Sequence, residues 1–308
     1  MRHSLPPEGE RYRGRFAPSP SGPLHLGSLL TALASFLEAR SRGGNWLVRI
    51  DDIDSQRTRP GAADAILRSL EALGLYWDGG VIHQRQRLER YRAAIECLQS
   101  RGLIYACACS RRELAETPSH GIYPGTCRGR NHAPLAGRHA LRVVTTETPI
   151  HFEDRVQGPV MRNLARELGD FIVYRRDGDY AYHLATVVDD ADQGITDILR
   201  GQDLLESTPR QIYLQRLLVL PSPTYAHTPL LIDAGGHKLS KRTLAPEAET
   251  RQPQRILEAL LGWLRHPLPK MLAGAPMADI LAWAVGQWRL DRLRRAGPIQ
   301  VDPERLNA

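Results

Sequence analysis

The sequence predicts an α/β protein with a doubly wound parallel sheet. A short candidate strand at residues 13–17 runs into a loop rich in proline, serine and glycine. From residue 26 to residue 37 the apolar side chains recur at helical spacing, and Gly43 with Gly44 ends the pattern. Residues 46–50 then form a compact apolar run typical of a buried strand. This order of strand, glycine-containing turn, helix and strand opens a Rossmann-like nucleotide-binding fold.

The rest of the chain extends this pattern into two predicted regions. Residues 1–235 form a nucleotide-binding domain with a loop-rich insertion at about 101–168, and residues 236–308 hold a lysine-bearing loop and a small helical region. Within the insertion, the helical period disappears between residues 107 and 131. The other expected elements are helices at 62–73, 88–99, 256–264 and 280–288, and a strand at 171–174 followed by a turn at Asp177 and Gly178.

Composition narrows the class of protein. Apolar residues make up 42% and charged residues 24% of the 308 residues, which is typical of a soluble globular chain rather than a disordered or fibrous one. Lys and Arg number 41 against 34 acidic residues, so the net charge of +7 suits a polyanionic partner such as RNA. No apolar stretch approaches the ~20 residues that cross a bilayer, and the polar start lacks the apolar core of a secretory signal. We expect a cytoplasmic protein.

Two segments carry residues suited to phosphate. His25 and Gly27 lie where the first helix begins, and backbone N–H groups with the helix dipole favour an anion there. Lys238 and Lys241 flank Ser240 on a loop after two glycines, where ammonium groups can reach a triphosphate. For each segment alone there is an alternative: a helix-capping loop with a surface histidine for the first, and a solvated lysine loop for the second. Both segments, in this order on a nucleotide-binding fold, favour an ATP site.

Three of the four cysteines predict a metal site. Cys107, Cys109 and Cys127 lie in the loop-rich insertion, and three thiolates at this spacing suit one structural Zn²⁺, which prefers four tetrahedral ligands. Cys97 lies in a helical pattern, and we expect it in the core. The fourth ligand stays open from chemistry alone, the candidates being His120, Tyr123 and His132.

These motifs resemble the class I aminoacyl-tRNA synthetases. Residues 25–28 match the HIGH signature and residues 238–241 match KMSKS. The segments 15–20, 49–54, 182–185 and 187–190 are similar to the glutamyl branch and less so to the glutaminyl branch. The match covers roughly residues 13–245. The resemblance implies the class I catalytic core, and an enzyme of the ligase type that activates L-glutamate with ATP, with Mg²⁺ accompanying the nucleotide, and transfers it to tRNA.

The resemblance also implies site residues. The catalytic residues would be His25 and Lys241, and the ATP site would comprise His25, Gly27, Ser28, Lys238, Ser240 and Lys241. The glutamate site would comprise Arg15, Ser19, Asp51, Tyr182 and Arg200, and Tyr123 would join Cys107, Cys109 and Cys127 as the fourth zinc ligand. Position 51 departs from the family, which usually has Glu there, and Thr186 stands where full glutamyl enzymes carry Asn. Arg15 or Arg200 could alternatively serve only to pair with Asp189, Asp190 or Asp192.

The region after the lysine loop bears on the RNA acceptor. About 67 residues follow Lys241, too few for the large helical anticodon-binding region of full glutamyl enzymes. The pattern resembles truncated glutamyl paralogues that attach glutamate to queuosine in the anticodon loop of tRNA(Asp). The alternatives are a truncated enzyme that charges a tRNA 3′ end and a non-catalytic RNA-binding module. No membrane partner is expected, and the sequence alone identifies no stable protein partner.

Overall fold

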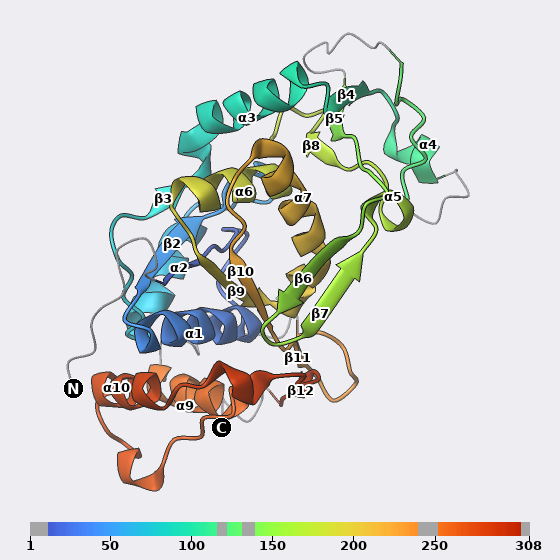
Figure 1. The fold of residues 1–308 in the computed structure, drawn as a ribbon. Coiled ribbons are helices and arrows are strands. Elements are labelled where there is room, and N and C mark those ends of the chain that lie inside the picture. The colour runs from blue at the N-terminus through green and yellow to red at the C-terminus, as the bar shows by residue number, and fades with distance from the viewer. Residues whose placement is uncertain (1–11, 116–121, 131–138, 240–251, 303–308) are drawn as a thin grey trace, which may run out of the picture.

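The centre of the protein is a mixed α/β core built on parallel strands (Figure 1). The structure, a computed structural model, describes residues 12–115, 122–130, 139–239 and 252–302. Strand β2 (Asn45–Ile50) pairs in parallel with β1 (Arg13–Phe16) and β3 (Ile82–His83), and β9 (Asp197–Gly201) pairs in parallel with β10 (Thr224–Thr228). The Thr196 N–H donates to the Arg13 carbonyl oxygen at 3.0 Å, which places β9 beside β1. The predicted α/β class is confirmed.

Helix α1 (Leu26–Ser41) lies at the centre and is buried on nearly every side. One face covers β1 and β9, and the opposite face meets α9 (Pro253–Trp263) and α10 (Met277–Gln287), which lie beneath it in Figure 1. The Trp288 indole N–H donates to Glu38 at 2.7 Å and fixes this contact. Because both faces are covered, leucine and alanine surround the helix instead of forming one stripe.

The predicted helices form within three residues of their expected ends. Besides α9 and α10, they are α2 (Ala62–Ala72) and α3 (Leu88–Ser100). Strand β8 (Ile172–Tyr174) and its turn also form, with Gly178 at φ +95°. The expectation for Cys97 was wrong, because its side chain lies on the solvent face of α3 and is exposed.

The region predicted as a loop-rich insertion contains more regular structure than its sequence indicated. Strands β4 (Ile104–Cys107) and β5 (Ala140–Val143) join β8 in an antiparallel sheet, and α4 (Arg111–Ala115) follows β4. Strands β6 (Ile150–Asp154) and β7 (Gly158–Arg162) form a hairpin, followed by α5 (Leu164–Glu167). Strand β6 pairs with β10, so the hairpin extends the sheet that holds β9.

The remaining elements complete the two hydrophobic clusters on either side of the central strands. Helices α6 (Tyr182–Asp192) and α7 (Thr208–Leu218) pack together over the face opposite α1. In the described part of the chain, no helix is long and apolar enough to span a membrane. The short elements are β11 (Leu231–Ile232), β12 (Ile299–Gln300) and the 3₁₀ turns Gln84–Arg87, Gln202–Ser207, Lys270–Leu272 and Leu290–Leu293.

Candidate active site

A cavity of about 340 Å³ opens where β1, β9 and β10 end and α1 begins. Ligands bind at this edge in open α/β sheets, because the loops that follow parallel strands meet there. The cavity brings together segments that are up to 224 residues apart in the chain, between Arg15 and Leu239. Of the residues predicted for ATP and glutamate, those that line it are Arg15, Ser19, His25, Gly27, Ser28, Tyr182, Arg200 and Lys238.

His25 is both the cap of α1 and a wall of the cavity. Its extended backbone places the imidazole over the first turn, where Nδ1 accepts a hydrogen bond from the Ser28 N–H at 3.2 Å. Nε2 lies 3.1 Å from the Ser28 hydroxyl. A Cβ on Gly27 would lie 3.2 Å from the imidazole, so glycine preserves the position of the ring. The H-x-G pattern thus shapes the helix terminus at which an anion is favoured.

Arg15 reaches the cavity from β1, and a buried ion pair fixes its guanidinium group. Its Nε and Nη2 donate to the two carboxylate oxygens of Asp190 at 3.1 and 3.2 Å, and its side chain is almost fully buried. Burial alone would raise the pKa of Asp190, but Arg15 and Arg49 hold it below its ordinary value. The pairing with Asp190 weighed from the sequence therefore exists, and Arg15 lines the cavity as well.

Arg200 reaches the cavity from β9 with a different set of partners. Its Nε donates to Nε2 of His227 at 3.1 Å, and its Nη2 donates to the Thr208 hydroxyl at 2.8 Å. Its Nη1 is buried without a hydrogen-bond partner among the described residues. A buried guanidinium N–H group without a partner is costly unless a ligand completes it. An anion bound in the cavity could therefore supply the missing acceptor for Nη1 of Arg200.

Lys238 lines the cavity from the loop that precedes Leu239. Its ammonium group pairs with Asp203 at 2.7 Å, and both side chains are partly exposed. Asp203 was not among the predicted site residues; the available signal was its place just after β9, where the chain turns into the cavity. A Cβ on Gly201 would lie 2.6 Å from the Asp203 carboxylate, so glycine permits this turn. Ser240 and Lys241 lie outside the described residues.

Asp51 does not line the cavity, although its backbone N–H donates to the Pro18 carbonyl in the cavity loop at 2.9 Å. Its carboxylate turns to Arg49 at 2.8 Å, and its second oxygen is buried without a partner among the described residues. The predicted contact with the substrate ammonium group stays a prediction. Thr186, the other departure, is buried on α6.

Asp51 gives a pH-dependent test of this buried cluster. Burial, opposed by Arg49, raises its pKa to about 6. An acid whose folded pKa is raised favours the folded state at low pH, and this contribution is lost as the pH rises from about 4 to about 6. Between pH 5 and pH 7 we expect the free energy of unfolding to fall by about 1 kcal/mol more in the wild type than in Asp51→Asn. Urea unfolding at both pH values measures the difference, and parallel curves would contradict the assigned shift.

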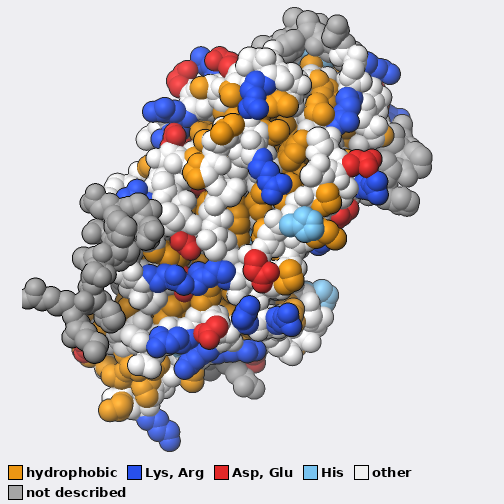
Figure 2. Space-filling view, viewed as in Figure 1, with side chains coloured by type: hydrophobic (Ala, Val, Ile, Leu, Met, Phe, Trp, Pro, Cys, Tyr) orange, Lys and Arg blue, Asp and Glu red, His pale blue; other side chains and the backbone are white. Residues whose placement is uncertain are grey.

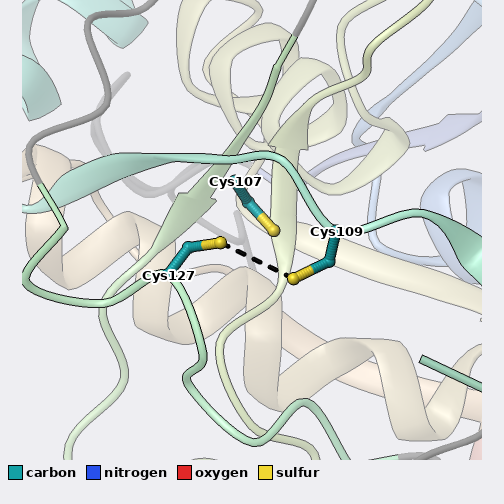
Figure 3. A group of neighbouring side chains, drawn as sticks. All are labelled: Cys107, Cys109 and Cys127. Carbon is teal, nitrogen blue, oxygen red and sulfur yellow. Dashed lines mark hydrogen bonds between the residues drawn. The ribbon is translucent and has the colours of Figure 1, made fainter. Parts of the chain in front are cut away.

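A second site lies in the insertion, where three thiols converge (Figure 3). The sulfur atoms of Cys107, Cys109 and Cys127 all lie within 4.8 Å of one another, with Cys109 and Cys127 at 3.5 Å. The Tyr123 hydroxyl lies 3.4 Å from the Cys107 sulfur and 3.8 Å from the Cys109 sulfur. Tetrahedral zinc with bonds of about 2.3 Å to sulfur separates its ligands by roughly 3.5 to 3.8 Å. The Cys109–Cys127 separation and the two distances to the Tyr123 hydroxyl are close to this range, and the three thiols could hold one zinc ion. His120 and His132 lie outside the described residues.

The molecular surface carries basic side chains over the C-terminal segment. Figure 2 shows Lys and Arg gathered toward the bottom of the view, where this segment lies. Such a group of positive charges suits the phosphates of a nucleic acid. Within residues 252–302, the described part of this segment, the exposed arginines are Arg255, Arg265, Arg289, Arg292, Arg294 and Arg295.

Comparison with known proteins identifies the class. The family model of the catalytic domain of class I tRNA synthetases (E and Q) matches residues 11–260, and the chain belongs to this family of ligases. Within it, the chain is 53% identical to the glutamyl-Q tRNA(Asp) synthetase of Thiobacillus denitrificans, over 91% of this chain and 94% of that protein. It is also 53% identical to the enzyme of the same name from Methylococcus capsulatus, over 94% of this chain and 95% of that protein. The expected relationship to the truncated glutamyl group is confirmed.

A solved structure agrees on the fold. The glutamate tRNA ligase of Elizabethkingia meningosepticum, in complex with its amino acid, superposes with a TM-score of 0.78. The alignment covers 96% of this chain and 68% of that one at 24% identity. The class I catalytic fold predicted from the sequence is confirmed.

Proposed function

We propose that this enzyme activates L-glutamate with ATP and transfers the glutamyl group to queuosine in the anticodon loop of tRNA(Asp), in the cytoplasm where tRNA is found. The names of the relatives, which are more than 50% identical over most of their length, support the acceptor. The main observation in support of glutamate as the substrate is the composition of the cavity. Two buried arginines, Arg15 and Arg200, line it together with residues at the N-terminus of α1.

The first half-reaction forms the adenylate. The α-carboxylate of glutamate attacks the α-phosphorus of ATP, a new O–P bond forms, and pyrophosphate leaves with the bridging oxygen. Arg15 and Arg200 hold the substrate carboxylate, with Ser19 and Tyr182 completing the pocket. His25, the α1 terminus and Lys241 stabilise the charge that develops on the phosphate oxygens. Mg²⁺ is expected to enter with ATP as part of the substrate, and would neutralise negative charge on the phosphates.

The second half-reaction transfers the glutamyl group. A hydroxyl of the RNA acceptor attacks the carbonyl carbon of the adenylate, the mixed anhydride bond breaks, and AMP leaves. This step needs no protein nucleophile, so catalysis rests on positioning the acceptor over the cavity. The arginines of the C-terminal segment offer contacts to RNA phosphates.

Two measurements test the proposal. Glutamate-dependent exchange of labelled pyrophosphate into ATP, without RNA, tests activation, and its absence with every amino acid would contradict a catalytic role. Labelled glutamate is then offered to tRNA(Asp) with and without queuosine, each intact or lacking its 3′-terminal adenosine. Label that requires queuosine and survives 3′ trimming, and that nuclease mapping places in the anticodon loop, supports the proposal. Label that requires the terminal adenosine indicates a 3′-charging enzyme instead.

Zinc would be held by Cys107, Cys109, Cys127 and Tyr123, where it would supply a structural crosslink for the insertion. We expect Cys109→Ser to reduce the bound zinc from about one per chain to a small fraction and to lower the melting temperature by several degrees. Metal analysis and thermal melting measure both effects. Cys97→Ser is the matched control because Cys97 is exposed on α3, and it should leave the zinc content unchanged.

Two outcomes refine this site. Full zinc content in Cys109→Ser would contradict the assignment of the thiols. Tyr123→Phe removes only the hydroxyl, so we expect weaker zinc binding with the three thiols retained. Unchanged affinity in that variant would exclude Tyr123 as the fourth ligand.

A further inference from the structure

Behind Arg200 lies a buried chain of hydrogen bonds that crosses three neighbouring strands. Asp154 ends β6, His227 lies on β10 and Arg200 lies on β9. The Asp154 carboxylate is 2.5 Å from Nδ1 of His227, and Nε2 of His227 is 3.1 Å from Nε of Arg200. Asp154 and His227 are completely buried. Neither residue lines the cavity, so the reaction as described does not use them directly.

We infer that His227, oriented by Asp154, is a positioning residue that aims the Arg200 guanidinium at the substrate carboxylate. This inference rests on the proposed function, because it takes glutamate as the ligand of Arg200. Its physical basis is a set of hydrogen bonds. They fix both ring nitrogen atoms of His227, and the Nε and Nη2 groups of Arg200.

The protonation of the chain follows from Arg200. A guanidinium keeps its proton in proteins, so its Nε–H donates and Nε2 of His227 must accept. Nδ1 of His227 therefore carries the ring hydrogen and donates it to Asp154. The other carboxylate oxygen of Asp154 accepts the N–H groups of Val156, Gln157 and His227. Burial would raise the pKa of Asp154, but these bonds hold it below its ordinary value, while burial lowers the pKa of His227.

Thr208 provides the second anchor of the guanidinium. Its hydroxyl accepts from Nη2 of Arg200 at 2.8 Å and lies 3.2 Å from Nε2 of His227. With both Nε and Nη2 held, the guanidinium plane cannot turn about the Cδ–Nε bond without breaking two bonds. Nη1 is left as the group without a partner in the described part of the chain. A planar donor fixed this way binds a carboxylate with little further loss of entropy.

The partner of Arg200 is a neutral imidazole, which compensates less of the positive charge of Arg200 than a carboxylate in its place would. Arg15 pairs directly with Asp190, so much of its charge is compensated inside the protein. In the described part of the chain, the hydrogen bonds of Arg200 go to His227, Thr208 and the Leu204 carbonyl, none of which is a carboxylate. The compensating charge lies one imidazole away on Asp154. Arg200 therefore attracts an anionic ligand more strongly than it would if it were paired directly with a carboxylate.

The test compares two substitutions of similar size at His227. In His227→Gln the amide oxygen can occupy the place of Nε2 and accept from Arg200. In His227→Asn the shorter amide can donate to Asp154 but leaves Nε of Arg200 without an acceptor. We expect the glutamate KM in pyrophosphate exchange to rise by about tenfold to a hundredfold in His227→Asn and by less than about fivefold in His227→Gln, with the ATP KM unchanged in both.

A second pair keeps the test decisive if both His227 variants fail to fold. Thr208→Val removes the acceptor of Nη2 at nearly constant shape, and Thr208→Ser retains it. We expect the glutamate KM to rise by about fivefold to fiftyfold in Thr208→Val and to stay within about twofold in Thr208→Ser. Thermal melting records the structural cost of each change separately.

The outcomes separate this inference from the proposed function. A glutamate KM that matches the wild type in both Thr208→Val and His227→Asn overturns the inference, as does a rise in the ATP KM equal to that for glutamate. Wild-type enzyme without glutamate-dependent exchange defeats the proposed function itself. Wild-type exchange with indistinguishable variants within each pair defeats only the positioning role.

Discussion

Replacing Arg200 by Lys should raise the glutamate KM by roughly 100-fold, because one ammonium group cannot replace three directed N–H groups. In the structure the guanidinium donates to His227 and Thr208 and leaves Nη1 for a ligand. A lysine at this position could satisfy either the buried acceptors or the substrate carboxylate. The KM for ATP should change little, and pyrophosphate exchange at varied glutamate and ATP concentrations measures both values.

The control for this substitution is Arg216→Lys. Arg216 is exposed on α7, so the same chemical change there should leave both KM values near those of the wild type. Circular dichroism and thermal melting of Arg200→Lys establish whether the protein remains folded. A folded variant with an unchanged glutamate KM would remove Arg200 from the amino-acid site.

Local sequence patterns predicted the part of the site around α1. A strand, a turn and a helix that follow one another in the chain also adjoin in space, so His25 and Gly27 could be placed at a helix terminus before the structure was known. The burial of α1 on both faces likewise follows from its leucine and alanine content. The structure added that His25 itself caps the helix through Nδ1.

The surroundings of Arg200 could not be predicted in this way. Asp154 and His227 are 73 positions apart, and the pairing of β6 with β10 that joins them is a contact between distant segments. Periodicity gives the likelihood of a strand but not its neighbours in a sheet. The sequence accordingly predicted a loop-rich insertion where the structure has the β6–β7 hairpin that supplies Asp154.

The roles of two other residues, Asp51 and the fourth zinc ligand, did not follow from the residue types alone. The family resemblance implied a contact of Asp51 with the substrate ammonium group; in the structure its carboxylate lies 2.8 Å from Arg49 and does not line the cavity, so this contact stays a prediction. In the cysteine cluster, the spacing predicted three ligands, and chemistry alone left Tyr123 and two histidines open. The position of the Tyr123 hydroxyl between two sulfur atoms favours the ligand that the resemblance implied.

The second large effect is expected for a substitution of Lys241 in the lysine-bearing loop. Lys241→Ala should lower kcat for adenylate formation by about 100-fold or more, because removing one positive group that faces the transition-state charge typically has an effect of this size. Its zinc content should be unchanged, since the proposed zinc ligands lie between residues 107 and 127 and do not include Lys241. Pyrophosphate exchange and metal analysis of the same preparation measure both properties.

Lys238→Ala is the matched comparison within the same loop. Lys238 pairs with Asp203 at 2.7 Å in a partly exposed position, so part of its charge is already compensated. We therefore expect its loss to reduce kcat by less than about tenfold, with more of the change in the KM for ATP. Equal kcat values for the wild type and Lys241→Ala would remove the loop from the mechanism. A larger loss of kcat in Lys238→Ala than in Lys241→Ala would reverse the assignment, and would indicate that Lys238 leaves Asp203 to face the phosphates when ATP binds.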